Sequence, residues 1–284
     1  MNLDISGTPG TLTGSGRVAL VLEYNGAQYH GWQSQKSGHP TVQQYLEIAL
    51  SRVANCSVEV VCAGRTDAGV HASHQVVHFN TDVTRSQRSW VMGANANLPA
   101  DISVHWVGNV TENFHARFSA RSRRYRYVIY NHPIRAALFR EGLTWNYRPL
   151  DEHKMARAAQ HLVGRHDFSS YRAAGCQAKS PVREIEFLNV ERFGDFIIID
   201  VQANAFLHHM VRNIAGVLMS IGAGLNEESW SKDVLLAKDR AAGGITAPPF
   251  GLYLINVGYP CGEIPEFDPG PSFVKSYYFN SARS

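Results

Sequence analysis

The residues best suited to chemistry lie in the stretch CAGRTDAGVHASHQ, Cys62 to Gln75, where Arg65 and Asp67 stand two residues apart. A turn here would need only the glycines, which let the backbone bend and let a ligand come close. One interpretation is that Asp67 caps its own turn. The other is that Asp67 acts on a substrate as a nucleophile or a base. The stretch has no second carboxylate, which argues against the two-acid plan of glycosidases.

A carboxylate that is withdrawn from water needs a cation to stay ionised, and two arginines could supply it. Arg65 is one candidate, and Arg212 in FLHHMVRNIAG, residues 206–216, is the other. Met210 and Ile214 belong to an apolar stripe at helical spacing, and at about 100° per residue Arg212 points nearly opposite to it. We therefore expect Arg212 to reach out of the core near the start of a helix.

The stretch RFSARSRRYR, residues 117–126, holds five arginines and no acidic residue. On a strand, alternate side chains face opposite ways, so Tyr125 would face one way and Arg124 and Arg126 the other. Arginine forks bind phosphates and tyrosine rings stack on unpaired bases, which indicates nucleic acid. The alternative is a solvated edge with core tyrosines.

Two groups of histidines raise the question of a metal site. His208 and His209 are adjacent, residues adjacent on a helix diverge, and no carboxylate or cysteine joins them at ligand spacing. His71, His74 and His78 cross from a loop into a strand rather than sharing a helix face. We expect no metal in either group and assign the histidines to packing or to RNA contact.

Composition narrows the class of protein. The chain has 284 residues, 44% hydrophobic and 18% charged, which is enough for a substantial core and argues against global disorder. The net charge of +3 leans only mildly toward polyanionic partners. Four dispersed cysteines without a C-x-x-C pair suit a reducing cytosol. We find neither a secretory signal nor an apolar run of the roughly 20 residues that span a membrane.

The elements that must position these residues follow one order twice: strand, helix, strand, strand, helix, strand. This order is typical of a ferredoxin-like fold. We predict an α+β protein whose two ferredoxin-like halves join into a mixed, mainly antiparallel sheet, with helices on one face and a central cleft. The expected elements of the first half are 17–24, 41–54, 57–64, 74–82, 86–98 and 102–110. Those of the second half are 123–131, 150–164, a hairpin around 194–195, 208–224, an extra helix 229–239, and 252–260.

Thr41 and Ser86 are the expected N-caps, and Asp151 is expected at or near the start of its helix. The predicted boundaries are a flexible tail 1–16, halves 17–117 and 118–260, and a tail 261–284.

Several motifs together resemble the TruA-type tRNA pseudouridine synthase family. In chain order they are YNGAQYHGWQ, CAGRTDAGVHA, QVVHF, NANLP, FHARFSA, RRYRYVIYN, ANAFLHHMVRNIAG and GLYL, and they run from about residue 17 to 260. The resemblance implies an isomerase that converts uridine to pseudouridine at positions 38, 39 and 40 of the tRNA anticodon stem-loop. It also implies a cytoplasmic homodimer in which one tRNA touches both subunits, with no metal and no organic cofactor.

The resemblance also implies roles for particular residues. Asp67 would be the nucleophile, attacking either the ribose C1′ or the uracil C6, or acting partly as a base. Arg212 would pair with Asp67, and Tyr125 would stack on the target base. Arg65 would fill the space that the flipped nucleotide leaves, and Leu252 would form an apolar wall of the pocket. Arg124 and Arg126 are our candidates for phosphate contacts.

Two other functions remain to be weighed. A non-catalytic RNA-binding protein on the same fold would need no aspartate in the loop, and a metal-dependent hydrolase would need carboxylate ligands beside the histidines. The chain departs from the family at Asn25, where an aspartate is common, and in the two tails.

Overall fold

A computed structural model describes residues 11–12, 16–36, 38–260, 262–265 and 270. The chain forms two compact units. The first contains residues 1–121 and 256–269, and the second contains residues 122–255 and 270–284. The boundary therefore follows Arg121 rather than residue 117, and the segment after Ile255 returns to the first unit. Within the described residues, none of the helices combines the length and the apolar character needed to cross a bilayer.

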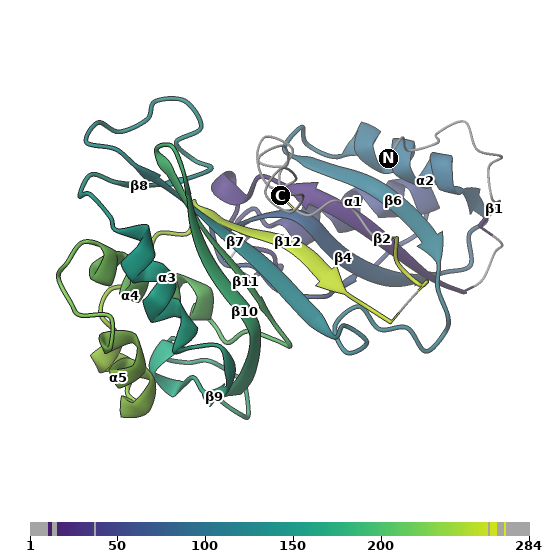
Figure 1. The fold of residues 1–284 in the computed structure, drawn as a ribbon. Helices are drawn as coiled ribbons and strands as arrows, with labels where there is room; N and C mark the ends of the chain where they lie inside the picture. Colours follow the sequence, from purple (N-terminus) through teal and green to yellow (C-terminus); the bar gives the residue numbers. More distant parts are fainter. Residues whose placement is uncertain (1–10, 13–15, 37, 261, 266–269, 271–284) are drawn as a thin grey trace, which may run out of the picture. The chain divides into compact units, whose positions relative to one another are not determined.

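The first unit has the predicted order of elements (Figure 1). Its antiparallel sheet runs β6–β2–β4, and the short strand β3 pairs with β4. Helices α1 and α2 pack against each other, and α2 packs on β6. The main elements are β2 Gly16–Tyr24, α1 Val42–Ala54, β3 Val61–Cys62, β4 His71–Thr81, α2 Gln87–Asn97 and β6 Ile102–Asn109. A two-residue strand, β1 Thr11–Leu12, pairs with β5 Arg85–Ser86 and lies inside the expected N-terminal tail.

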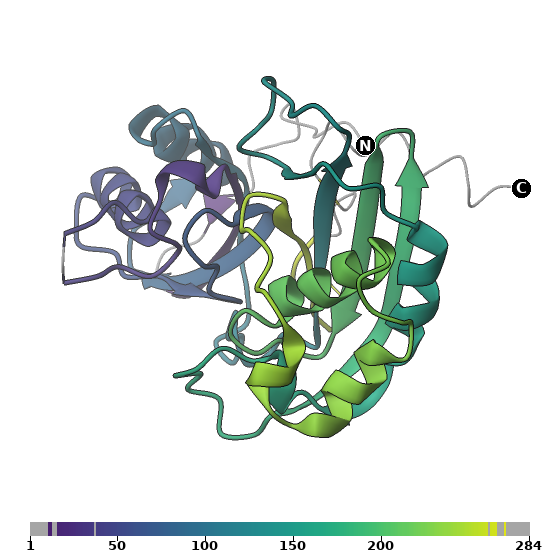
Figure 2. The same cartoon turned by 90° about the vertical axis from the view of Figure 1, so that its left-hand side faces the viewer.

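The second unit repeats the ferredoxin-like order and adds to it. Its strands run β12–β7–β11–β10–β9, and β8 joins β7 in parallel, so the strand pairing is mixed but mainly antiparallel, as predicted. Helices α3 and α4 pack on each other and lie on one face of these strands (Figure 2). The elements are β7 Ser122–Asn131, β8 Thr144–Asn146, α3 Glu152–Gln160, β9 Gly164–Asp167, β10 Val182–Phe193, β11 Phe196–Ala203, α4 Met210–Gly222, α5 Trp230–Ala237 and β12 Leu252–Gly258. Residues 252–255 of β12 belong to this unit.

The helix starts follow local hydrogen bonding. Ser86 accepts a bond from the backbone of Ser89, so this predicted N-cap is confirmed. Asp151, which was expected at or near the start of its helix, is the N-cap of α3 and accepts a bond from Lys154. The Lys154 N–H also holds the pKa of Asp151 below its usual range. Thr41 is the N-cap residue of α1, but its side chain makes no cap bond, and it is fully buried.

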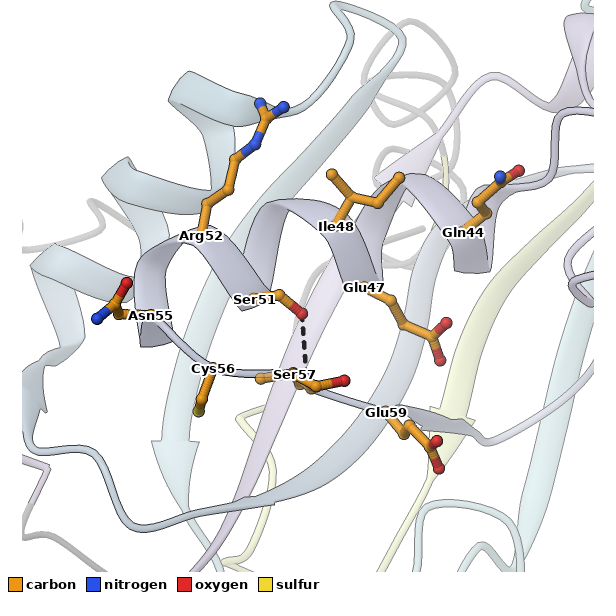
Figure 3. Close-up of a pocket in the computed structure, with 10 residues that line it drawn as sticks. Gln44, Glu47, Ile48, Ser51, Arg52, Asn55, Cys56, Ser57 and Glu59 are labelled. Carbon is orange, nitrogen blue, oxygen red and sulfur yellow. Dashed lines mark hydrogen bonds between the residues drawn. The ribbon is translucent and has the colours of Figure 1, made fainter.

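The strand predicted over 57–64 is reduced to Val61–Cys62 because helix α1 takes its backbone bonds. The N–H of Val58 donates to the Ser51 hydroxyl at 2.9 Å (Figure 3). The N–H of Val60 donates to the Glu47 carboxylate at 3.0 Å. Between this segment and α1 lies a shallow hollow of about 720 Å³. None of the predicted site residues lines it.

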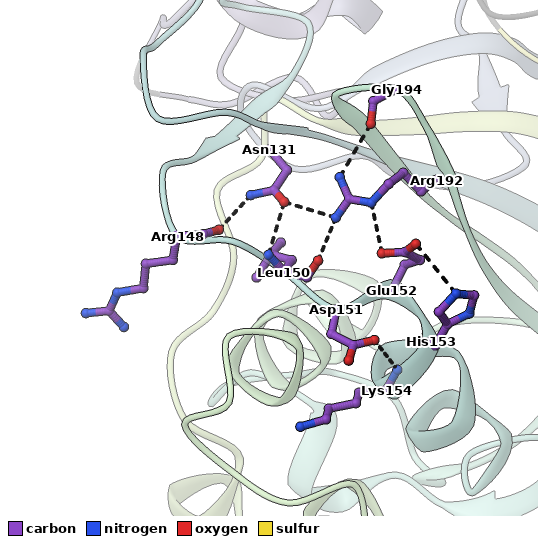
Figure 4. A network of polar contacts seen from close by, with 9 residues as sticks. All are labelled: Asn131, Arg148, Leu150, Asp151, Glu152, His153, Lys154, Arg192 and Gly194. Carbon is purple, nitrogen blue, oxygen red and sulfur yellow. Dashed lines mark hydrogen bonds and ion pairs between the residues drawn. The ribbon is translucent and has the colours of Figure 1, made fainter.

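An arginine ties three elements of the second unit together. The guanidinium of Arg192, near the end of β10, donates to Glu152 at 2.8 Å, to the Leu150 carbonyl at 2.6 Å and to Asn131 at 3.1 Å (Figure 4). Its bond to Glu152 is the main cause of the lowered pKa of that carboxyl. The end of β7 and the start of α3 are thereby fixed to the hairpin β10–β11.

Candidate active site

The loop of residues 64–70 connects β3 to β4 and carries both residues on which the sequence analysis turns. Arg65 is exposed and Asp67 is half-buried. The backbone closes the turn, because the N–H of Val70 donates to the Asp67 carbonyl at 3.1 Å and Gly69 has a φ of +77°. Backbone groups therefore help to close the turn that carries Asp67.

The N-terminal motif YNGAQYHGWQ is hydrogen-bonded to the backbone and side chain of this loop. The N–H of Trp32 donates to the Thr66 carbonyl at 3.0 Å, and the Tyr24 hydroxyl lies 2.8 Å from the Thr66 hydroxyl. Gly31 has a φ of +86°, and a Cβ there would lie 2.7 Å from the Thr66 carbonyl oxygen. The backbone beside Asp67 is thus held by contacts that tolerate little movement.

The same motif contains the departure from the family at Asn25. The Asn25 side chain accepts the N–H of Ala27 at 3.1 Å and so caps a short 3-10 helix. An aspartate oxygen could accept the same bond, so the substitution preserves the cap and removes one negative charge. Next to it, Gly26 donates to Nδ1 of His71 at 3.0 Å and lies against the Val70 backbone so closely that a Cβ would overlap it.

The histidines of β4 act as buried acceptors for backbone groups. Nδ1 of His74 accepts the N–H of Val257 at 3.3 Å, and Nδ1 of His78 accepts the N–H of Ala116 at 3.1 Å. Burial lowers the pKa of each to about 4, so both rings are neutral at pH 7. These contacts fit the packing interpretation.

Cys62, at the entrance of the loop, is not suited to nucleophilic chemistry. Burial raises the pKa of its thiol to about 12, although the charge of Arg65 opposes the shift. The reactive form of a cysteine is the thiolate, which is therefore scarce at neutral pH. Within this loop, Asp67 is left as the candidate nucleophile.

In the second unit, Tyr125 lies in the middle of β7, opposite Val201 of β11. It is 8% exposed, and Phe206 meets its ring edge-on with centroids 5.1 Å apart. Tyr127 on the same face is fully buried and its hydroxyl bonds to Thr144 and to the Pro248 carbonyl, so it belongs to the core. Of these two tyrosines, Tyr125 is the one that keeps some exposed ring.

Arg124 and Arg126 share a partner that the sequence analysis missed. Asp200 of β11 accepts two bonds from Arg124, at 2.7 and 2.8 Å, and one from Arg126 at 2.8 Å. Asp200 and Arg126 are each only 2% exposed. The structure thus gives both arginines a carboxylate partner inside the unit, and burial keeps Arg126 from reaching a phosphate at the surface. The missed signal was a single acid inside the apolar run DFIIIDVQ.

Arg212 lies near the start of a helix and reaches out of the core, as the sequence predicted. The stripe of α4 is buried and Arg212 is partly exposed. Its Nε donates to the Ala247 carbonyl at 2.8 Å, and the N–H of Ala247 returns a bond to the Arg212 carbonyl at 3.1 Å. Leu252 begins β12 and is 5% exposed.

His208 and His209 lie before helix α4 and not within it, so the prediction of a helix from residue 208 was wrong. Helix α4 begins at Met210, and His209 precedes it with a φ of +59°. The two rings lie side by side with centroids 4.0 Å apart rather than diverging. A turn, not helical geometry, sets the directions of these side chains.

Comparison with known proteins identifies the family. A family model described as tRNA pseudouridine synthase matches residues 20–119 and 158–260, which together make up more than half of the chain. The chain belongs to the tRNA pseudouridine synthase family. The matched segments include the loop of Asp67 and the helix of Arg212, whereas Tyr125 and its two flanking arginines lie between them.

Curated members of the family are similar over nearly their whole length. The chain is 59% identical over 262 residues to tRNA pseudouridine synthase A of Pseudomonas aeruginosa, covering 92% of each protein. It is 57% identical to the protein of that name from Alcanivorax borkumensis, covering 91% of this chain and 97% of the relative. For Coxiella burnetii the identity is 56%, covering 91% and 99%.

Proposed function

We propose that this protein converts uridine to pseudouridine in tRNA, at positions 38, 39 and 40 of the anticodon stem-loop, with Asp67 as the nucleophile. The observation that carries the proposal is the family match together with a complete GRTDAG loop whose backbone is held by hydrogen bonds. Relatives more than 55% identical are named tRNA pseudouridine synthase A.

The reaction rearranges one nucleotide without any net addition. The bond between N1 of uracil and C1′ of ribose breaks, the uracil turns, and a new bond joins C5 to C1′. C5 loses its proton and N1 gains one, so the atoms balance without a redox partner. Asp67 would attack C1′ or C6 and leave again when the new bond has formed. Because the freed base must not escape, the pocket has to keep it beside the ribose between the two steps.

The first unit would open the RNA and begin the chemistry. The target base must leave its stack, which costs a few kcal/mol. Arg65 is exposed next to Asp67 and is suited to occupy the space that the flipped nucleotide leaves. The glycine at position 69 and the braced backbone let the loop meet the nucleotide without reorganising.

The second unit would hold the base and balance the charge. Tyr125 is proposed to stack on the uracil, and Phe206 keeps its ring in one orientation. Arg212 is proposed to pair with Asp67, and its bond to Ala247 limits the directions its guanidinium can take. Leu252 would supply an apolar wall. We propose no metal and no organic cofactor for the reaction.

We also propose that the enzyme works in the cytoplasm as a homodimer. Support for self-association comes from the segment between β7 and β8. Ile134, Leu138 and Phe139 are 71%, 77% and 71% exposed there. Apolar side chains gathered on one exposed segment are typical of a protein interface.

The test is Asp67→Asn, which keeps the size of the side chain and removes its charge. Release of tritium from 5-tritiated uridine in unmodified tRNA should fall by roughly three orders of magnitude or more, while tRNA binding largely persists. Asp82→Asn is the matched control, because it removes one exposed carboxylate from the same unit outside the loop. The control should keep its activity, and mapping of the product should locate the modified positions.

Two results would contradict the proposal in different ways. Near-normal activity of Asp67→Asn would remove Asp67 from the role of nucleophile. A wild-type protein that binds tRNA tightly and releases no tritium would instead support the non-catalytic RNA-binding alternative.

A further inference from the structure

Phe118 is the most exposed large apolar side chain among the described residues of the first unit. It is 76% exposed, whereas the next, Met92, is 54% exposed. Phe118 lies in the turn that connects β6 to the end of the unit, outside the loop of Asp67 and outside the second unit that carries Tyr125. The proposed chemistry gives this residue no task.

The turn that carries Phe118 is closed by its own hydrogen bonds. Nδ1 of His115 accepts the N–H groups of Arg117 and Phe118, each at 3.2 Å. The N–H of Ser119 donates to the His115 carbonyl at 2.8 Å, and the Ser119 hydroxyl accepts the His115 N–H at 2.9 Å. Burial and the charge of Arg17 lower the pKa of His115, which keeps Nδ1 available as an acceptor.

Buried anchors fix this turn to the body of the unit. Phe114 is 1% exposed, and its carbonyl accepts a bond from Arg17 at 2.7 Å. Ala116 donates its N–H to His78, and its carbonyl accepts the Tyr259 hydroxyl at 2.6 Å. The backbone is thus hydrogen-bonded both before and after Phe118. Little conformational entropy would therefore be lost when a ligand binds the exposed ring.

The ring of Phe118 sits between aromatic and cationic groups. The His115 ring lies 4.3 Å from it, centroid to centroid, at an angle of 33°, and the Arg117 guanidinium lies 5.7 Å from its centroid. Arg121 is also exposed, and residues 113–126 contain no acid, although the exposed Glu112 precedes them. A flat ring beside one guanidinium, with a second exposed arginine three residues further along the chain, matches the chemistry of an unpaired base and its phosphates.

We propose that Phe118 is a stacking platform for an unpaired base of the tRNA substrate, separate from the base that undergoes reaction, and that Arg117 and Arg121 contact the adjoining phosphates. The inference rests on the proposed function, because that function supplies the RNA. It adds a second point of RNA contact on the first unit, which fixes the substrate while another nucleotide is flipped.

The experiment compares three substitutions of one side chain. Phe118→Leu keeps the apolar bulk and removes the flat ring, Phe118→Ala removes both, and Phe118→Trp enlarges the ring. Loss of one base–aromatic stack predicts binding of unmodified tRNA weakened about 5- to 150-fold for the first two variants and retained for the third. Met92→Ala, an exposed apolar change elsewhere in the unit, should bind normally.

Two further readouts separate stacking from a general structural effect. Stacking predicts that tRNA quenches the fluorescence of the indole that Phe118→Trp introduces, beyond any change in the wild type. It also predicts a higher KM for tRNA at nearly unchanged kcat in Phe118→Leu. Arg117→Gln should lower the salt dependence of binding by about one phosphate contact.

The outcomes distinguish this inference from the proposed function. A wild-type enzyme without tritium release overturns the proposed function, whatever Phe118 does. An active wild type with Phe118→Leu binding tRNA equally well, or an unquenched indole in Phe118→Trp, overturns the platform. A change in the oligomeric state of Phe118→Leu also overturns it, because the ring would then contact a second copy of the chain.

Discussion

Replacing Asp200 by asparagine should lower the stability of the second unit against local unfolding. Asp200 holds Arg124 through two bonds and Arg126 through one. The side chains of Asp200 and Arg126 are 3% and 2% exposed, whereas Arg124 is 24% exposed. In Asp200→Asn, Arg124 can turn toward water, but Arg126 stays buried and loses the carboxylate to which its Nε donates at 2.8 Å.

The expected magnitude follows from that asymmetry. Removing one partner of a buried ion pair costs about 3–5 kcal/mol, because the charge that remains is uncompensated. The total free energy of unfolding of a native domain is only about 5–15 kcal/mol. Since Asp200 lies opposite Arg126 across β11 and β7, the loss acts on the strand that carries Tyr125. We expect amides of both strands to exchange with solvent about 150- to 5,000-fold faster.

Hydrogen exchange of peptides from 122–131 and 196–203 is the assay, because it reports on the second unit alone and needs no two-state unfolding of the whole chain. The matched control is Glu228→Gln, which breaks another two-bond pair, that of Arg157, at 2.9 and 2.6 Å, but in an exposed setting. Exposed pairs add little to stability, so this change should be much smaller.

A second variant tests the cause. Adding Arg126→Met to Asp200→Asn removes the buried guanidinium as well and should recover at least half of the lost protection. If Asp200→Asn exchanges no faster than Glu228→Gln, or if the double variant is worse than the single one, the buried-charge argument is refuted.

Two other predictions concern the histidines of β4 and self-association. The pKa of His74 and of His78 is about 4 in the folded protein, below the usual value of about 6.5, so each contributes stability that is full above pH 6.5 and is lost as the pH falls toward 4. His78→Asn keeps an acceptor for the backbone and should remove at most about 3 kcal/mol of that difference between pH 7.5 and 4, measured by urea unfolding; an unchanged pH dependence would contradict it. Leu138→Glu should shift the proposed dimer toward monomer in sedimentation experiments, and an unchanged mass would place the interface elsewhere.

Regular periodicity made most of the fold predictable. Apolar spacing located the helices and strands to within a few residues, and the doubled order of elements indicated the ferredoxin-like architecture. The prediction of a strand was wrong where side chains, and not a neighbouring strand, accept the backbone N–H groups. Residues 57–60 have the alternation of a strand, yet Ser51 and Glu47 accept the N–H bonds that a neighbouring strand would have taken. Such bonds come from a helix that precedes the segment, and the composition of the segment does not reveal them.

The site was predictable in part, and for a similar reason. Asp67 and Arg212 could be named because their surroundings are local: a glycine-flanked turn and the polar side of one helix turn. The sequence did not reveal that Gly31 and Trp32, more than thirty residues earlier, hold the backbone of this loop. A close approach between two backbone segments requires a glycine, but a glycine in a sequence does not identify the segment that it contacts. The resemblance to the family included that motif, but its physical task became visible only in the structure.

The arginine-rich stretch shows how one pattern can hold two different tasks. As a sequence, residues 117–126 are a uniform basic run. In the structure the run divides at the start of β7: Arg117 and Arg121 are exposed on a braced turn, whereas Arg126 is buried against Asp200. An acid 74 residues further along the chain decides which arginines face solvent, because strand register brings it opposite Arg126. The positive charge that this stretch exposes therefore lies mainly in the turn beside Phe118, while Arg126 links β7 to β11 next to Tyr125.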